Sequence, residues 1–553
     1  MKPYRIILVF PPIDPPAAES LPPIGLLKIA ALLDKAGYAV SVLDCIILLR
    51  KGVLHRNKKI YEEIARLINN SKPDLVGFNT QCASYPSCIN IARHVKSIRK
   101  DTKIVFGGPF SSLCAVETLK RFTEIDFIVL GEAEITLLEL VRTLDEQRDI
   151  QTVNGIVFKE AGQIIRTKAR ALIQNLDELP FPAYQLLDLG GNSSNPLAEY
   201  QNINSVVVDR AFPKKTLIDD GRGCEHRCSY CTEPLIWGHK PRRRTSSNIV
   251  KEIIELKSKF GAEFVEFTHD HFSSRKSGVK EFCQTLLDQK IDIKWGCRAR
   301  LDMVDTKLLE KMKAAGCSEI IYGVESFSTE MLKSMKKDMR NIELMLSTIQ
   351  QTVALEIHAH LSFMVGFPWE QPGQVDDTLD KMLEIVKNSG GWAVPYIQLL
   401  SVQPGTELWE RYHDRLELNR IPGFCQGTDF DDRKFLSEDI QLIKSDLQIF
   451  APFYNIKTEN VPLDTLYVIS TCFKPLAMRN PRGFRSLLEL SDSSLMEFFE
   501  AMKQWLGKEI EDLDKLSRLP KNDLYELIDR YSRSFCASQF FKSLTSDDSN
   551  RSR

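Results

Sequence analysis

The chain has 553 residues, of which 43% are hydrophobic and 27% charged, so it is long enough for about three or four domains and too apolar for wholesale disorder. Lys plus Arg number 73 and Asp plus Glu 74, and a net charge of -1 gives no general attraction to nucleic acid or to an anionic membrane. The longest apolar run, VSVLDCIILL, is too short for a membrane span and contains Asp44. The first apolar run is too short for a signal-peptide core. We therefore expect a cytoplasmic protein with no membrane or nucleic-acid partner.

The 13 cysteines are an odd number spread over a large chain without a secretory signal. This pattern argues against a disulfide framework. Reduced thiols or metal ligands are the expected roles.

Residues 1–150 alternate short apolar runs with amphipathic segments, which is typical of a doubly wound α/β domain with a parallel sheet covered on both faces. The expected strands are 5–10, 38–45, 73–80, 103–108 and 126–131, and the expected helices are 24–37, 59–70, 87–100, 117–122 and 135–144. Residues 151–205, with a small hairpin around Ala161-Gly162 and the polar stretch GGNSSNP, are interpreted as a linker.

A second series of strands and helices fills residues 206–410, and its six strand-helix units predict a partial barrel. Such barrels build their sites from the loops at the carboxyl ends of the strands. The expected strands are 216–224, 263–270, 293–301, 318–326, 358–368 and 396–405. Beyond about residue 410 the alternation stops, so residues 411–553 are predicted to form a mostly helical domain that shapes the substrate pocket.

The strongest signal is GRGCEHRCSYC at the end of the first barrel strand, where Cys224, Cys228 and Cys231 have CxxxCxxC spacing. Three thiolates on one loop can hold three irons of a cubane cluster and leave the fourth iron open for a ligand. The alternative is a zinc site completed by His226 or a distant residue, although structural zinc loops usually use paired CxxC or CxxH spacing.

This motif, followed by a six-stranded partial barrel, resembles the radical SAM superfamily. The resemblance implies a [4Fe-4S] cluster on the three cysteines and S-adenosylmethionine bound to its open iron. It also implies contacts to the adenosyl and amino-acid parts from Tyr230 of the cysteine motif and from residues of the motifs THDHF, GCRAR, YGVES and VGFPWE; the latter residues are Thr268, His269, Asp270, Arg298, Arg300, Glu325 and Gly366.

Two further patterns in the barrel are open to more than one interpretation. His358 and His360 alternate on one strand and so share a face, which suits either a ligand site or a polar core. The run Arg242, Arg243 and Arg244 is interpreted as a solvated face.

Glycines and small polar residues follow the strands of the first domain, at the edge where an open parallel sheet binds ligands. No GxGxxG follows the first strand, which disfavours a dinucleotide site. The segments GGPF and DFIVLGEAE resemble the cobalamin-binding domain of cobalamin-dependent radical SAM enzymes. By that resemblance the corrin or its nucleotide tail contacts Asn79, Thr80, Gln81, Gly107, Gly108, Gly131 and Glu132.

The first domain departs from many cobalamin proteins in one respect. It has no DxHxxG loop to give the cobalt a histidine, and the first strand is followed instead by Asp14-Pro15-Pro16. The lower face of cobalt is then expected to carry water, another residue or nothing. A domain that keeps the fold but binds no cobalamin is the alternative.

The family resemblance implies a methyltransferase that moves a methyl group from S-adenosylmethionine, through methylcobalamin, to an unactivated carbon or phosphorus of a biosynthetic intermediate. A 5'-deoxyadenosyl radical would first abstract hydrogen from the acceptor, or an sp2 carbon would accept the methyl group by polar transfer. An external electron donor such as flavodoxin or ferredoxin is implied, together with a small-molecule or peptide substrate.

Three other functions are compatible with parts of this sequence to different degrees. A cobalamin-dependent radical cyclase or ring-rearranging enzyme would share the same two front domains. Methylthiolation needs a second cluster, and the remaining cysteines form no comparable triad. A corrinoid or iron-sulfur sensor would need an output module, such as a helix-turn-helix, that the C-terminal helices do not resemble.

Overall fold

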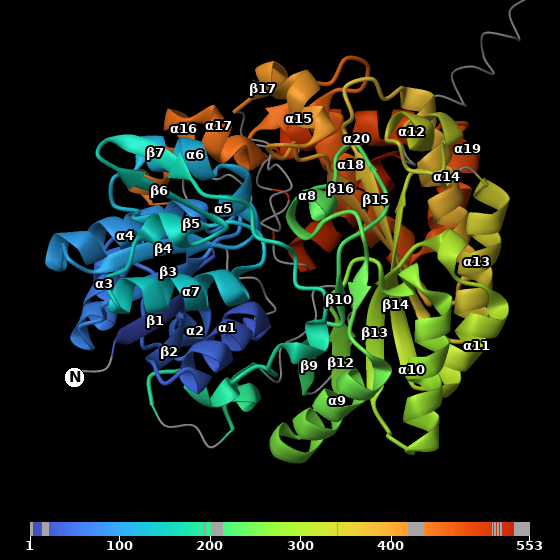
Figure 1. Ribbon diagram of the computed structural model, residues 1–553. Coiled ribbons are helices and arrows are strands. Elements are labelled where there is room, and N and C mark those ends of the chain that lie inside the picture. The colour runs from blue at the N-terminus through green and yellow to red at the C-terminus, as the bar shows by residue number, and fades with distance from the viewer. Residues whose placement is uncertain are drawn as a thin grey trace, which may run out of the picture.

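The computed structural model describes residues 4–13, 21–191, 195–200, 214–339, 341–418, 436–510, 513, 516, 519 and 522–535. Two large sheets organise these residues, and they lie side by side in Figure 1, with the first in blue to cyan and the second in green to yellow. Asp14, Pro15 and Pro16, which stand where the DxHxxG loop would be, lie outside the described residues.

The first sheet has eight strands in the order β7-β6-β5-β4-β3-β1-β2-β8. All neighbours pair in parallel except β5 with β6 and β6 with β7. The order 2-1-3-4-5 within it is that of a doubly wound fold whose switch point lies between β1 and β3, where ligands bind. The strands are β1 Arg5–Phe10, β2 Ala39–Asp44, β3 Leu75–Asn79, β4 Lys103–Gly107, β5 Phe127–Val129, β6 Ile156–Glu160, β7 Gln163–Arg166 and β8 Leu187–Asp188.

Helices cover both faces of this sheet because its central strands are apolar on both sides, as the buried centre of β1 illustrates. Helices α1 and α7 share one buried apolar cluster with one face, and α2, α3, α4 and α6 share a second cluster with the other. The helices are α1 Ile24–Lys35, α2 Cys45–Arg50, α3 Ile60–Asn70, α4 Tyr85–Ile98, α5 Pro109–Leu113, α6 Ala115–Arg121 and α7 Ala133–Asp145.

The second sheet is a six-stranded partial barrel of parallel strands in the order β16-β15-β14-β13-β12-β9. A short antiparallel pair, β10 Gly221–Arg222 and β11 Arg242–Arg243, follows β9. The barrel strands are β9 Lys215–Ile218, β12 Phe264–Phe267, β13 Lys294–Ala299, β14 Cys317–Glu325, β15 His358–Val365 and β16 Ala393–Leu399. The fold class expected from sequence is thereby confirmed.

Local sequence signals set where the barrel helices begin and end, and α9 is an example. Thr245 caps α9 by accepting a hydrogen bond from the Asn248 amide, and Gly261 ends the helix in the left-handed conformation. The helices are α8 Glu233–Trp237, α9 Ser246–Phe260, α10 Lys276–Asp288, α11 Thr306–Ala314, α12 Thr329–Ser334, α13 Ile342–Ala354, α14 Pro372–Asn388 and α15 Glu407–Tyr412.

Two segments differ from the sequence interpretation. The stretch interpreted as a linker adds β6, β7 and β8 to the first sheet, and its buried Tyr184 and Tyr200 join the core that runs into the barrel. The C-terminal helices are shared between both halves, since α16 packs on α4 whereas α18 packs on β16 (Figure 1). The C-terminal elements are α16 Ser437–Ser445, α17 Leu447–Phe450, α18 Leu463–Arg479, α19 Pro481–Ser491, α20 Leu495–Glu509, β17 Leu416–Glu417 and β18 Asn455–Ile456.

Within the part of the chain that the structure describes, no helix combines the length and the apolarity needed to cross a membrane.

Candidate functional site: a cysteine loop facing a glycine-lined sheet edge

The three cysteines lie on the loop that joins β10 to α8, at the carboxyl end of the barrel strands. Gly223 opens the loop with a φ of 88°, and a Cβ there would lie only 2.8 to 3.1 Å from three carbonyl oxygens, those of Lys240, Gly238 and Trp237. Only glycine fits such a turn without strain. His269 Nε2 donates to the Gly223 carbonyl over 2.8 Å, which holds the start of the loop against the end of β12.

The rest of the loop is anchored through its backbone. The Ser229 amide donates to the Met335 carbonyl over 2.9 Å, and the Leu408 amide donates to the Ser229 carbonyl over 3.1 Å. The Cys231 amide closes a turn onto the Cys228 carbonyl. These bonds fix the three cysteine positions relative to the barrel.

The three loop thiols differ from the other cysteines that the structure describes. They are half-buried, whereas the other eight described cysteines are buried. Burial, followed by the Glu225 carboxylate and the neighbouring Cys228, raises the pKa of Cys224 to about 11. Burial also raises the pKa of Cys228 and of Cys231. Because three thiolates here would repel each other, the loop suits a multiply charged cationic group, and it fits a cluster held by three cysteines.

Tyr230 and Glu325 lie together next to this loop. Burial, followed by the Glu325 carboxylate, raises the pKa of Tyr230. Glu325 ends β14 at an irregularity in its register with β15, and its φ of 67° is a strained value for a residue other than glycine. Lys337 Nζ donates to Glu325 Oε1 over 2.6 Å. Strained backbone that the surroundings hold in place is concentrated at functional sites.

The other residues that the sequence assigns to S-adenosylmethionine stand at the ends of neighbouring strands. Asp270, which is 60% exposed, lies 3.6 Å from Arg298 Nε, and Arg298 Nη2 donates to Glu266 Oε1 over 2.9 Å. The Thr268 amide donates to the Ile218 carbonyl. Gly366 follows β15 with a φ of 98°, and its amide donates to Glu370 Oε2 over 2.7 Å.

The residues assigned to cobalamin line the carboxyl edge of the first sheet. Asn79 ends β3 and Gly107 ends β4, so the strand order brings their loops together. The Thr80 side chain and amide both donate to the Gly107 carbonyl, over 2.9 and 2.8 Å. Gly108 has a φ of 113°, and a Cβ there would lie 2.8 Å from Asn79 Oδ1.

Two glycine turns, one at Gly107-Gly108 and one at Gly131, form this edge. Ser112 ties its two glycine turns together: Ser112 Oγ donates to the Gly108 carbonyl over 2.9 Å and accepts from the Gly131 amide over 3.0 Å. No histidine occurs in residues 10–27, 79–85, 107–113 or 130–133. The edge therefore fits a planar corrin approached by backbone and without a histidine ligand to cobalt.

The glycine edge and the cysteine loop meet at α8. A Cβ on Gly131 would lie 3.5 Å from the Ile236 carbonyl of α8, and α8 begins two residues after Cys231. The adjacent Leu235 side chain is 50% exposed. In Figure 1, α8 stands between the first sheet and the barrel.

Glu132, assigned from sequence to the cobalamin edge, takes part in a buried ion-pair network between the two halves. Its Oε1 accepts from Arg222 Nη1 over 3.0 Å and from Arg242 Nη1 over 2.8 Å. Arg222 also pairs with Glu134 and with Asp219 Oδ2, the latter over 2.9 Å. Lys28 of α1 pairs with Asp219 over the same distance.

The interpretation of Arg242, Arg243 and Arg244 as a solvated face is wrong. Arg242 and Arg244 are each 6% exposed, and Arg244 Nη1 pairs with Glu252 in the barrel. Arg243 pairs with the buried Asp220 over 3.3 Å. Arg242 and Arg244 are buried, and the Arg243 side chain is only 13% exposed, because each pairs with an acidic side chain inside the protein.

His358 and His360 share the inner face of β15, as their spacing predicts, and both are buried. His360 Nε2 lies 3.6 Å from Glu319 Oε2 of β14, and the His358 ring packs 4.4 Å from the Trp392 ring. They belong to a polar layer inside the barrel.

Several residues at the site were not assigned from the sequence. His271 lies 3.9 Å from Cys224 Sγ through its Nδ1, and Lys337 holds Glu325. Burial, followed by the Asp270 carboxylate, raises the pKa of Glu233 to about 8. His271 stands within the THDHF motif, which is the one signal that pointed to it.

Two family models match the chain. The B12 binding domain matches residues 16–141, and the Radical SAM superfamily matches residues 218–382. These matches coincide with the glycine-edged first sheet and with the barrel that carries the cysteine loop.

Relatives and solved structures resemble the chain over most of its length. An uncharacterized methyltransferase of Pyrococcus horikoshii is 27% identical over 416 residues, covering 74% of this chain and 83% of that protein. The anaerobic magnesium-protoporphyrin IX monomethyl ester cyclase of Synechocystis sp. is 27% identical over 321 residues, covering 58% of this chain and 60% of the cyclase. A structure of the radical S-adenosylmethionine methyltransferase TsrM from Kitasatospora setae, with cobalamin and a [4Fe-4S] cluster bound, superposes with a TM-score of 0.58 at 17% identity, covering 88% of this chain and all of TsrM.

Proposed function

We propose that this chain, which belongs to the radical SAM enzymes with an N-terminal B12-binding domain, is a cobalamin-dependent methyltransferase. It would transfer a methyl group from S-adenosylmethionine, through methylcobalamin, to an unactivated carbon or a phosphorus of a biosynthetic intermediate. Its cofactors are cobalamin, a [4Fe-4S] cluster and S-adenosylmethionine. The P. horikoshii relative, which carries the name of a methyltransferase, and the likeness to TsrM support this choice.

One structural observation carries the proposal: the cysteine loop and the glycine edge of the first sheet come together at α8. A Cβ on Gly131 at the sheet edge would lie 3.5 Å from the Ile236 carbonyl, and α8 follows directly from the cysteine loop. A methyl group carried at the sheet edge and a radical generated at the loop would act on one substrate only if their two sites adjoin. This arrangement supplies that proximity.

The chain's own residues would position the reactants, because the cofactors carry out the bond-making and bond-breaking steps. Cys224, Cys228 and Cys231 would hold the cluster, which when bound supplies the electron that cleaves S-adenosylmethionine. Tyr230 and Glu325, the latter held by Lys337, lie where they would orient the adenosine.

Thr268, Asp270 and Arg298 stand at neighbouring strand ends, where they would hold the amino-acid part of S-adenosylmethionine, and Gly366 would lie on its adenine side. At the sheet edge, Gly107, Gly108 and Gly131 would present backbone to the corrin. Asn79, Thr80 and Gln81 would flank its nucleotide tail. Glu132 would act there through the ion pairs that fix the edge against the barrel.

A cobalamin-dependent radical cyclase is the second candidate, because the Synechocystis relative is named a cyclase and aligns with over half of this chain. The two reactions leave different products. A methyltransferase places the labelled methyl group of S-adenosylmethionine on the substrate, whereas a cyclase leaves the substrate carbon count unchanged.

The deciding experiment incubates the reconstituted enzyme, under reducing anaerobic conditions, with methyl-labelled S-adenosylmethionine and a library of candidate small molecules. Label in a new product, with S-adenosylhomocysteine formed alongside, supports the methyltransferase. Stoichiometric 5'-deoxyadenosine then separates radical from polar transfer. A cyclised, unlabelled product overturns the methyltransferase in favour of the cyclase.

Three finer assignments belong to the same proposal. The substrate is a small molecule or a peptide, with neither nucleic acid nor membrane as partner. Electrons come from an external flavodoxin or ferredoxin, which cross-linking and reduction kinetics would test. The location is cytoplasmic, which cell fractionation would test.

A further inference from the structure

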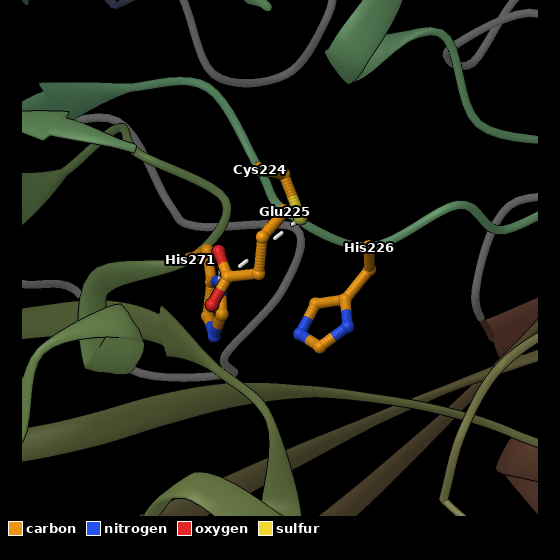
Figure 2. Close-up of side chains that lie close together, drawn as sticks. All are labelled: Cys224, Glu225, His226 and His271. Carbon is orange, nitrogen blue, oxygen red and sulfur yellow. Dashed lines mark hydrogen bonds and ion pairs between the residues drawn. The ribbon is translucent and has the colours of Figure 1, made fainter. Parts of the chain in front are cut away.

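The cysteine loop contains a second group of metal-binding side chains that overlaps the cysteine triad. Cys224, Glu225 and His226 come from the loop itself, and His271 comes from the segment between β12 and α10. One ligand atom from each of the four lies within 4.8 Å of the others. Figure 2 shows them gathered around one point.

The separations suit a single small cation. His271 Nδ1 lies 3.9 Å from Cys224 Sγ and 3.4 Å from Glu225 Oε2. Ligand atoms at about 2.0 to 2.3 Å from a tetrahedral zinc ion stand about 3.3 to 3.8 Å apart. The two measured distances are therefore close to those that one zinc ion requires.

An unpaired buried nitrogen lies in the same group. His226 Nε2 has no hydrogen-bond partner among the described residues, and the His271 side chain, which is 1% exposed, directs its Nδ1 toward Cys224 and Glu225. The two rings lie 5.1 Å apart. Buried polar atoms without partners are rare and call for an explanation such as an absent ion.

The charges also balance. On binding Zn²⁺, Cys224 releases its proton to solvent and becomes a thiolate, while Glu225 supplies a carboxylate and the two histidines bind as neutral rings. The two negative charges cancel the two positive charges of the ion. A neutral site suits buried surroundings.

We propose that in the cluster-free protein Cys224, Glu225, His226 and His271 bind one zinc ion. Zinc held there occupies Cys224 and so competes with the [4Fe-4S] cluster. The zinc site follows from the four side chains alone, and only the competition rests on the proposed function.

The test uses the full-length, cluster-free protein, with Co²⁺ as a visible stand-in for Zn²⁺. The double variant Cys228→Ala/Cys231→Ala removes the triad and keeps the four groups. It should bind one Co²⁺ with tetrahedral absorption and a charge-transfer band from one thiolate, and Zn²⁺ should displace the Co²⁺.

Adding His271→Ala to the double variant should weaken Co²⁺ binding by about 10- to 100-fold. Adding His239→Ala, which replaces an exposed histidine, is the matched control and should leave binding unchanged. Circular dichroism and cooperative thermal unfolding report whether each variant is folded. Two results would overturn the zinc site. One is Co²⁺ binding by the double variant that is equally tight with and without His271. The other is a double variant that is folded and binds no Co²⁺.

Competition is tested with the triad intact. Preloaded zinc should slow iron uptake into the wild-type protein and slow it less in His271→Ala. Equal slowing in both overturns the competition. A wild-type protein that takes up no iron even without zinc counts against the proposed function, and it leaves the Co²⁺ result on the double variant untouched.

Discussion

Arg222 and Cys224 stand two residues apart, yet their surroundings differ sharply. The Arg222 guanidinium is 7% exposed and lies among three carboxylates, those of Glu132, Glu134 and Asp219. Around Cys224, buried polar atoms lack partners among the described residues; they are His226 Nε2, Ser229 Oγ, His269 Nδ1, His271 Nε2 and Ser273 Oγ. In the ion-pair network around Arg222, the one buried polar side-chain atom without a partner among the described residues is Arg242 Nε.

This difference separates two tasks. Burying charges is costly unless they are paired, so a network that is nearly complete within the chain stabilises the contact between the two halves by itself. A loop that places three thiols beside ring nitrogens and hydroxyls without partners is complete only with a bound group. The comparison therefore assigns alignment of the halves to Arg222 and cofactor capture to the loop beside it.

The largest expected effect comes from the loop. Cys228→Ala should abolish stable iron incorporation, because two cysteines hold a cubane cluster poorly. Cys297→Ala, which replaces a buried thiol of β13, should keep its iron. Iron and sulfide analysis after anaerobic reconstitution measures both, and full iron in Cys228→Ala would contradict the assignment of the loop.

The next effect comes from the ion-pair network. Arg222→Met leaves three buried carboxylates short of a partner and should destabilise the cluster-free protein by about 3 to 5 kcal/mol. Arg148→Met breaks an exposed pair with Glu146 and should change stability by less than about 1 kcal/mol. Denaturant unfolding measures both, and equal losses would show that the network does not stabilise the contact.

A substitution at the edge of the first sheet is expected to cause a smaller loss of stability. Gly108→Ala forces a side chain onto a φ of 113° and within 2.8 Å of Asn79 Oδ1 and the Thr80 carbonyl, at a cost of about 1 to 3 kcal/mol. Cobalamin affinity should fall with it. Gly25→Ala, where a Cβ meets nothing within 4 Å, is the control and should leave cobalamin affinity unchanged in equilibrium titration.

The smallest effect concerns pH. Burial alone would raise the pKa of Asp219, but Lys28 and Arg222 outweigh it and hold that pKa below its usual 3.8. The ionised Asp219 carboxylate therefore stabilises the folded protein at any pH above about 4. This contribution is lost only as the pH falls through the lower pKa that Asp219 has in the folded protein. The stability difference between wild type and Asp219→Asn should stay level from about pH 5 to 8 and shrink below about pH 4. A difference that disappears between pH 5 and 8 would contradict this sign.

Sequence patterns predicted the features that are local in the chain. The CxxxCxxC loop, the strand-helix alternation of both sheets and the shared face of His358 and His360 all depend on spacing alone. Glycine positions at the ends of β4 and β5 were visible for the same reason.

Pairing between distant residues was not predictable in this way. Arg242 looked solvated because its partner, Glu132, is 110 residues away, and Glu132 looked like a ligand-binding residue for the same reason. The linker gave no sign that β8 would pair with β2, because a strand of two residues has no periodicity.

The most direct test of the two-cofactor account is a metal assay of the wild-type protein, reconstituted anaerobically with iron, sulfide and hydroxocobalamin. The account predicts about four irons and one cobalt per chain, with the iron lost and the cobalt kept in Cys224→Ala. Iron without cobalt would contradict the methylcobalamin route, and zinc in place of iron in the reconstituted protein would contradict the cluster assignment itself.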